Sequence, residues 1–316
     1  MRGSVTLFIV AGGALLLAFV PFAASDVFMQ FAINALLLAT LAQSWNIIGG
    51  FTGYVSFGNS VFYGLGIYGT AIAMAVFQLP FAVGLLCGLV LAVLCALLIG
   101  IPILRLRGPY FAIATLGLSA AMGALISNIG IAGANTGLIL PLIRADAMFY
   151  WSALVLLLFC TLTVYWLSRG RFGAGLVAIR EDEDAAATMG VNTTLYKVIA
   201  LVLSAAFTSV AGGIYAYWIS FIDPASSFDP TLNVRMVIMA VFGGPGTVLG
   251  PLVGSFILSA IYEALTSWIS TAAALLFGIV IVLAVIFAPR GIGDVIAGMR
   301  KSGWRYLTRN VREHKL

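Results

Sequence analysis

Polar side chains that could form hydrogen bonds with a small solute are concentrated in one stretch of an otherwise apolar sequence. Gln43 and Asn46 end an apolar run, and Ser56 and Asn59 follow within a glycine-rich segment. Amide and hydroxyl dipoles can contact a small polar solute briefly, whereas a deep fixed charge would hold it. Glycines let irregular backbone line a path at membrane depth. The stretch predicts a translocation pathway; helix packing is the alternative, because small and amide residues often join membrane helices.

A second glycine-rich interruption divides the apolar stretch 231–268. Each interruption follows one apolar run and precedes another, which indicates an internal repeat whose two breaks meet at a central seam. The candidate pathway residues are Gln43, Asn46, Gly49, Gly50, Gly53, Ser56, Gly58, Asn59, Gly243, Gly244 and Gly246.

Groups for catalysis or cofactor binding are sparse. His314 is the only histidine, the three cysteines lie in apolar segments, and no cluster has metal-ligand spacing. The sequence has no glycine-rich P-loop for ATP phosphates. We therefore expect neither an enzyme nor a metal or cofactor site. Ion-coupled carriers place ionisable groups at mid-membrane, whereas Glu263, the one candidate, is predicted near the outer end of a span.

Composition decides which elements must position these groups. Of 316 residues, 62% are hydrophobic and 9% charged, against roughly 25% charged in soluble domains. The mean hydropathy is +1.11. Continuous apolar runs exclude a transmembrane β-barrel, whose strands alternate apolar and polar residues, and the composition excludes soluble enzymes and nucleic-acid binders. The sequence predicts an all-α polytopic membrane protein embedded in a lipid bilayer.

About ten transmembrane helices are expected. The apolar runs predict spans at 5–22, 28–48, 61–78, 81–104, 110–129, 149–168, 198–220 and 271–288, and 231–268 is either one kinked helix or two short spans. Counting it as two places fourteen basic residues in the cytoplasm and leaves Arg144 and Arg235 outside, while one crossing gives seven against nine. Ten spans with both termini cytoplasmic are therefore predicted. Arg2 before the first apolar run leaves a cleaved signal peptide as the alternative for span 1.

The expected domains are a single transmembrane domain, 1–288, with a cytoplasmic loop at 169–197, and a basic cytoplasmic tail, 289–316. Within the loop, acidic residues followed by an alanine run and Gly190 predict one short helix. So short a helix is unstable alone in water. It either packs on its own protein or docks a cytosolic partner.

Four stretches carry recognisable motifs, in this order along the chain: 46–68 with GGFTGYVSFG, 104–116 with LRLRGPYFAIATL, 178–192 with AIREDE and MGVN, and 242–251 with FGGPGTVLGP. Together they resemble the motifs of bacterial branched-chain amino-acid ABC importer permeases of the LivM type, so the domain 1–288 is expected to be a permease domain. The resemblance implies a fold like that of type II ABC importers. It also implies a bacterial inner-membrane location and work with a second permease subunit, two cytosolic ATPase subunits and a periplasmic substrate-binding protein.

The resemblance also implies roles for residues in the loops. The segment from Asp184 to Gly190 is similar to the EAA…G element that contacts the ATPases, so the expected coupling residues are Arg180, Glu181, Asp182, Glu183, Asp184, Ala185, Ala186 and Gly190. The expected contacts with the binding protein are the outward-facing Arg144, Asp223, Asp229 and Arg235.

Two departures from the family pattern leave the solute open. Tyr54 stands where glutamine is common, and Asn59 where histidine is common. Branched-chain amino acids are implied, but related permeases carry other amino acids, urea or short amides. A stand-alone secondary carrier or channel for a small neutral solute is the alternative function. A carrier would stop with uncouplers, whereas an ABC importer would stop when ATP hydrolysis is blocked.

Overall fold

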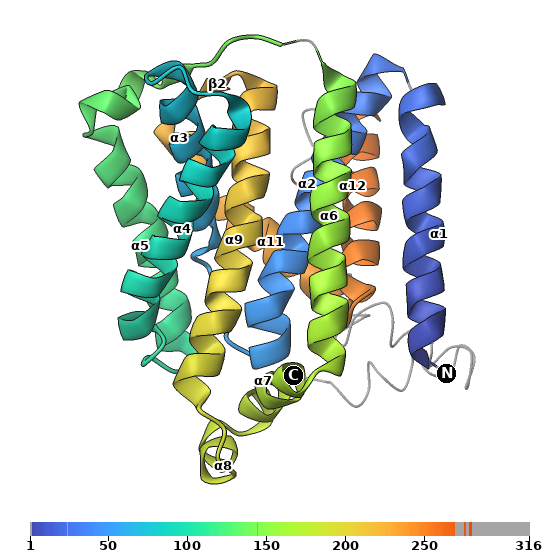
Figure 1. The fold of residues 1–316 in the computed structure, drawn as a ribbon, viewed down its shortest axis with the longest axis vertical. Coiled ribbons are helices and arrows are strands. Elements are labelled where there is room, and N and C mark those ends of the chain that lie inside the picture. Colours follow the sequence, from blue (N-terminus) through green and yellow to red (C-terminus); the bar gives the residue numbers. More distant parts are fainter. Residues whose placement is uncertain (1, 24, 144, 269–274, 276–277, 280–316) are drawn as a thin grey trace.

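The apolar runs fold as helices that stand side by side (Figure 1). This computed structural model describes residues 2–23, 25–143, 145–268, 275 and 278–279. The long helices are α1 (Arg2–Ala23), α2 (Asp26–Trp45), α3 (Asn59–Ala75), α4 (Phe81–Ile103), α5 (Pro109–Ser127), α6 (Asp146–Arg169), α9 (Thr193–Ile219), α11 (Pro230–Gly243) and α12 (Gly250–Trp268).

Short elements connect these helices. They are the π-helix η1 (Asn46–Gly50), the 3-10 turns η2 (Gly130–Ala132) and η3 (Ala134–Thr136), the helices α7 (Arg171–Glu181), α8 (Glu183–Thr188) and α10 (Pro224–Ser227), and the strands β1 (Leu138–Ile139) and β2 (Phe221–Ile222). The two strands pair antiparallel at the end of the molecule opposite α7 and α8 (Figure 1).

Five helical segments in the described part of the chain are long and apolar enough to cross a membrane. They are Asp26–Gly50, Phe81–Ile103, Pro109–Ser127, Asp146–Arg169 and Thr193–Ile219. Each coincides with a predicted span, so the chain is a mostly helical, multi-pass membrane protein. The total of ten spans stays a prediction, and the predicted span 271–288 and the tail 289–316 lie largely outside the described residues.

The stretch 231–268 forms two helices that fold back on each other. A Cβ added to Gly250 would lie 2.9 Å from the carbonyl oxygen of Gly243, and one added to Gly254 would lie 2.2 Å from that of Met239. The later residue of α12 thus contacts the earlier residue of α11, so the two helices run antiparallel. The stretch is therefore two helices rather than one kinked helix. That each of them crosses the membrane stays a prediction.

The outer helices expose apolar side chains, while α3 is buried along most of its length. On α4 and α5, Leu98 is 75% exposed and Ile113 is 67% exposed. Such surfaces suit hydrocarbon rather than water. Glycines bring α3 against α9, because a Cβ at Gly66 would lie 2.0 Å from the carbonyl oxygen of Ser209. Small residues permit this backbone approach in membrane helices.

The first interruption between helices is shorter than the sequence predicts. Helix α2 continues through η1 instead of ending before Gly49, and α3 begins at Asn59 rather than at residue 61. The irregular backbone is therefore confined to residues 53–58. A π-helical turn leaves the regular i to i−4 ladder, and such turns occur often at functional sites.

Candidate functional site

The two predicted breaks lie against each other. The side-chain amide of Asn46 donates from Nδ2 to the carbonyl oxygen of Thr247 at 2.9 Å, and Asn46 Oδ1 accepts from the backbone N–H of Gly246 at 2.8 Å. Gln43 donates from Nε2 to the carbonyl oxygen of Val248 at 3.1 Å. One buried amide thus satisfies both a donor and an acceptor of a distant backbone turn, which fixes that turn in place.

These two breaks form a seam, defined here as residues 46–50 and 243–248, with no space for side chains at its centre. A Cβ at Gly50 would lie 2.5 Å from the backbone nitrogen of Gly246. A Cβ at Gly243 would lie 1.8 Å from the carbonyl oxygen at the start of α12. The glycine pattern is therefore required by close backbone packing. The internal repeat that it suggested stays a prediction.

Most of the candidate pathway residues are buried within the chain. The buried ones are Gln43, Asn46, Gly49, Gly50, Ser56, Gly58, Asn59, Gly243 and Gly244, while Gly246 is half-buried and Gly53 is exposed. Among the described residues, Gln43 Oε1 and Asn59 Oδ1 are buried without a hydrogen-bond partner, an arrangement that is costly in an apolar interior. The part these residues play in translocation stays a prediction.

The cytoplasmic loop predicted at 169–197 holds two helices rather than one. Helix α7 was not expected, although Leu176 and Ile179 are both buried and stand three positions apart on one face. Helix α8 begins where the acidic cluster predicted it, because Asp182 Oδ1 accepts from the backbone N–H groups of residues 184 and 185 at 2.9 Å each. Gly190 follows with φ +88°, a conformation typical of residues that end helices.

A buried lysine joins α8 to three other parts of the chain. Lys197, on the first turns of α9, is 3% exposed. Its Nζ lies 2.6 Å from Glu183 Oε1 and donates to the hydroxyl of Tyr54 at 3.0 Å and to the carbonyl oxygen of Leu104 at 3.1 Å. The Tyr54 hydroxyl in turn donates to Glu183 Oε2. All three hydrogens of the ammonium group are thus used, as a buried charge requires.

Arg107 closes this cluster from the connection between α4 and α5. Its guanidinium binds both carboxylate oxygens of Asp184, at 2.9 and 3.1 Å, and its Nε lies 3.8 Å from Glu183 Oε2. Burial disfavours the charged form of Glu183, but hydrogen bonds from Lys197 and Tyr54 and the two nearby cations hold the pKa of its carboxyl below the usual range. Hydrogen bonding to Arg107 likewise lowers the pKa of Asp184. Both carboxylates are therefore ionised at neutral pH.

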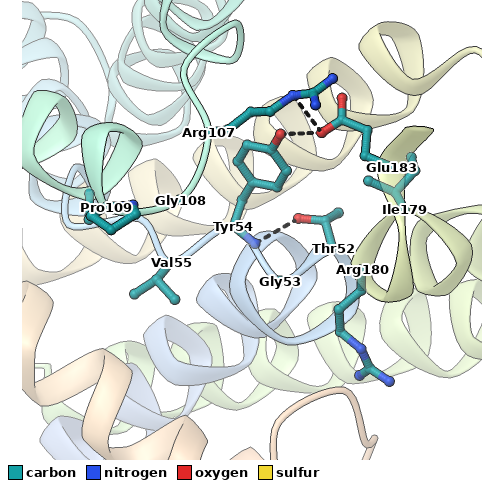
Figure 2. A pocket seen from close by; sticks show the side chains of 11 residues that line it. Thr52, Gly53, Tyr54, Val55, Arg107, Gly108, Pro109, Ile179, Arg180 and Glu183 are labelled. Carbon is teal, nitrogen blue, oxygen red and sulfur yellow. Dashed lines mark hydrogen bonds and ion pairs between the residues drawn. The ribbon is translucent and has the colours of Figure 1, made fainter. Parts of the chain in front are cut away.

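Helix α7 touches the seam directly. Arg180 donates from Nη1 to the carbonyl oxygen of Gly50 at 3.1 Å, and it pairs with Glu181 at 2.9 Å. A cavity of about 430 Å³ lies between α7, the start of α5 and residues 52–55, and Arg180, Tyr54 and Arg107 are among the residues that line it. Figure 2 shows these side chains around the cavity. The loop therefore meets the seam at Gly50 and the irregular backbone at Tyr54.

Sequence reasoning missed Lys197 and treated Tyr54 only as a departure from a pattern. A lysine near the start of an apolar run was one available signal, since such a residue needs a partner when it is buried. Glu183 supplies the charged partner. Tyr54 adds its hydroxyl and its ring, whose centroid lies 4.6 Å from Lys197 Nζ.

Of the residues expected to contact a binding protein, Asp223 directly follows β2 at the end of the molecule away from α7 and α8 (Figure 1). Asp223 and Asp229 cap the N-termini of α10 and α11, and Arg235 lies on α11. Burial opposes ionisation of Asp223, but hydrogen bonds from Ser226 lower its pKa below the usual range. Arg144 lies outside the described residues. The docking role of these residues stays a prediction.

Apolar spans around a buried polar seam, with a polar helical loop at one end, are typical of membrane permeases. Among the described residues, no group of three or more His, Cys, Asp or Glu is placed to hold a metal ion.

The chain matches the family model for the permease component of branched-chain amino acid transport systems over residues 27–287. The protein therefore belongs to that family, which consists of transporters and not enzymes.

Individual relatives agree with this assignment. The chain is 28% identical over 305 residues to the high-affinity branched-chain amino acid transport permease LivM of Salmonella typhimurium, covering 86% of this chain and 71% of that protein. It is 27% identical over 320 residues to LivM of Escherichia coli, covering 90% and 74%. It is also 32% identical over 106 residues to LivH of Escherichia coli, covering 34% and 33%.

Proposed function

We propose that this chain is one of two permease subunits of an ATP-driven importer for branched-chain amino acids. It works with a LivH-like second permease, two cytosolic ATPase subunits and a periplasmic binding protein that delivers the solute. It lies in the bacterial inner membrane with both termini in the cytoplasm, and it holds no cofactor of its own. Family membership and the similarity to both LivM and LivH support the assembly.

The observation that carries the proposal is the cluster around Lys197. A helix that moves with a cytosolic ATPase must be tied to the membrane part if its motion is to reach the pathway. Glu183 on α8 is held by Lys197 and Tyr54, and Tyr54 belongs to the irregular backbone beside the seam. At the end of α8, Met189 is 86% exposed, as an apolar anchor for a partner would be.

Reconstitution of the four kinds of subunit in vesicles tests this function. Leucine uptake driven by ATP and loaded binding protein should stop with vanadate and should continue with an uncoupler. Uptake that ignores vanadate and stops with the uncoupler would instead identify a secondary carrier. Omission of this chain should abolish uptake, whereas omission of the binding protein should lower the rate at micromolar leucine.

Alkaline phosphatase fusions test the orientation. The enzyme is active only outside the cytoplasm, so fusions at residues 140 and 226 should be active and fusions at 185 and 305 inactive. The expectation follows from the excess of basic residues on the cytoplasmic side. The structure places residues 107 and 184 in contact, so a fusion at 107 should behave like that at 185. Activity at 305 would contradict the ten-span arrangement.

The turn after α8 offers a test of coupling. Gly190 has φ +88° and open space where a Cβ would stand, so Gly190→Asn should be tolerated because asparagine adopts positive φ. Gly190→Trp adds both strain and bulk beside the exposed Met189. It should lower ATP hydrolysis stimulated by the loaded binding protein about tenfold, the equivalent of about 1.4 kcal/mol of coupling. Equal ATP hydrolysis by both variants, with normal assembly of the complex, would show that this turn does not contact the ATPase.

A further inference from the structure

A second cavity, of about 340 Å³, opens between α2, α3, α9 and α11 toward the end of the molecule away from α7 and α8. Its volume is in the range of small-molecule sites. On α2 it is lined by Asn34, Leu37, Leu38 and Leu41, whose spacing puts them on one face of the helix. From Asn34 to Leu41 the cavity follows α2 for about 10 Å. It therefore leads from the outer half of the bundle toward the depth of Gln43.

One wall of the cavity is aromatic. The rings of Tyr63 and Tyr215 lie 5.7 Å apart, and those of Tyr215 and Trp218 lie 6.1 Å apart. The leucines of α2 complete an apolar lining on which a branched aliphatic side chain can pack.

The rim carries one charge of each sign, both from the start of α11. Asp229 accepts from the backbone N–H of Thr231, and Arg235 lies within 5.2 Å of the Tyr262 ring. Neither residue forms an ion pair among the described residues, although both line the cavity. Side chains on a helix lean toward its N-terminus, so Arg235 leans toward the end that Asp229 caps.

We propose that this cavity is a transient binding subsite for an α-amino acid zwitterion with an apolar side chain. This inference rests on the proposed function and adds to it a place in the chain where the solute pauses. The carboxylate of the solute binds the Arg235 guanidinium, and its ammonium group faces Asp229 and the ring faces of the aromatic wall. Its side chain packs against Leu37 and Leu41.

The chemistry of the lining separates this solute from the alternatives. A urea or short amide carries no net charge at either end and has no use for two opposite charges at one rim. An amino acid with a charged side chain would leave that charge against leucine and aromatic carbon, which costs more than it gains. Because the cavity is open to one side and the two charges are at least partly exposed, binding is weak, as passage requires.

Three variants in the reconstituted importer test the subsite. Arg235→Gln removes the carboxylate contact, and Asp229→Asn removes the negative charge while asparagine still caps α11. Each should lower leucine uptake about tenfold. The affinity of the complex for the binding protein and the stimulated ATP hydrolysis should both stay within about twofold of the wild type. Trp218→Ala should change the ratio of leucine to alanine uptake about fivefold. Glu263→Gln, an exposed charge change on α12 outside the cavity, should leave every reading unchanged.

Cysteine labelling tests the same cavity without transport. In a background that lacks the native cysteines, Asn34→Cys should react with an aqueous methanethiosulfonate reagent in the purified complex without ATP. Millimolar leucine should slow the reaction, and urea or glutamate should not. This readout is independent of the importer mechanism, so absent ATP-driven uptake in the wild type would overturn the proposed function and leave the subsite standing.

Three results would overturn the subsite. Parallel loss of binding-protein affinity and ATP hydrolysis in the Arg235 and Asp229 variants would make the rim a docking surface, as expected from the sequence. If the same variants lost the second permease from the purified complex, the cavity would instead be part of the interface with that subunit. Unchanged leucine uptake, with labelling at position 34 that leucine does not slow, would leave the cavity without a role.

Discussion

Lys197→Met should uncouple the importer. Methionine fills similar volume but donates no hydrogen bond, so the Glu183 carboxylate and the carbonyl oxygen of Leu104 lose their donor. Removing one member of a buried ion pair typically costs about 3–5 kcal/mol, because the remaining charge stays buried. Helix α8 is then no longer fixed against Tyr54. Leucine uptake in cells should fall by about a hundredfold, a change that corresponds to about 2.7 kcal/mol.

Two further variants make this result specific to the pair. Arg105→Met removes an exposed cation from the same end of the molecule and should leave uptake within about twofold. Lys197→Met combined with Glu183→Gln removes both charges and should recover part of the loss, with an interaction energy of about 1–3 kcal/mol. Chain levels in the membrane are followed by immunoblot. Normal uptake by Lys197→Met would show that the cluster does not transmit ATPase motion.

Gly66→Val should prevent stable folding of the bundle. The new Cβ would lie 2.0 Å from the carbonyl oxygen of Ser209 and 2.6 Å from its carbonyl carbon. These are backbone atoms, which cannot rotate away as a side chain does, so α3 and α9 must separate along their length. Overpacking alone costs about 1–3 kcal/mol, and separating two helices exceeds that figure. The chain should be nearly lost from detergent extracts analysed by size-exclusion chromatography.

The matched control is Gly117→Val on α5. Both glycines are helical, but a Cβ at Gly117 meets nothing within 4 Å. This variant should elute as the wild type does and keep its Tm within a few degrees, since surface changes typically stay within about 0.5 kcal/mol. Equal loss of both variants would show that valine acts through helix propensity and not through the contact between α3 and α9.

The sequence was sufficient for the elements whose physics is local. The predicted span 81–104 corresponds to Phe81–Ile103 and 149–168 to Asp146–Arg169, because apolar runs of membrane length have few other ways to satisfy their backbone. The meeting of the two glycine breaks also followed from their pattern. The start of α8 at Asp182 followed from capping chemistry, which acts within three residues.

What the sequence could not predict depends on contacts between distant segments. The partners of Lys197 come from residues 54, 104 and 183, and no local pattern brings these three together. Where α2 continues into η1, Asn46 accepts a hydrogen bond from the backbone of Gly246, which lies 200 residues further along the chain. The sequence did not predict helix α7, because its two buried apolar residues stand among charged and glycine neighbours and its amphipathic pattern is therefore short.

The separation of 201 residues between Asn46 and Thr247 has a consequence for biosynthesis. A ribosome that adds about 5–20 residues per second needs about 10–40 s to reach the second partner after it has made the first. During that interval the amide of Asn46 is in the membrane without the backbone turn that will satisfy it. Closure of the seam therefore follows synthesis of most of the chain, and a nascent chain interrupted before α11 leaves the Asn46 amide without these partners. The same hydrogen bonds therefore join two parts of the bundle that are made far apart in time, and the seam stays open until α11 and the turn after it are in place.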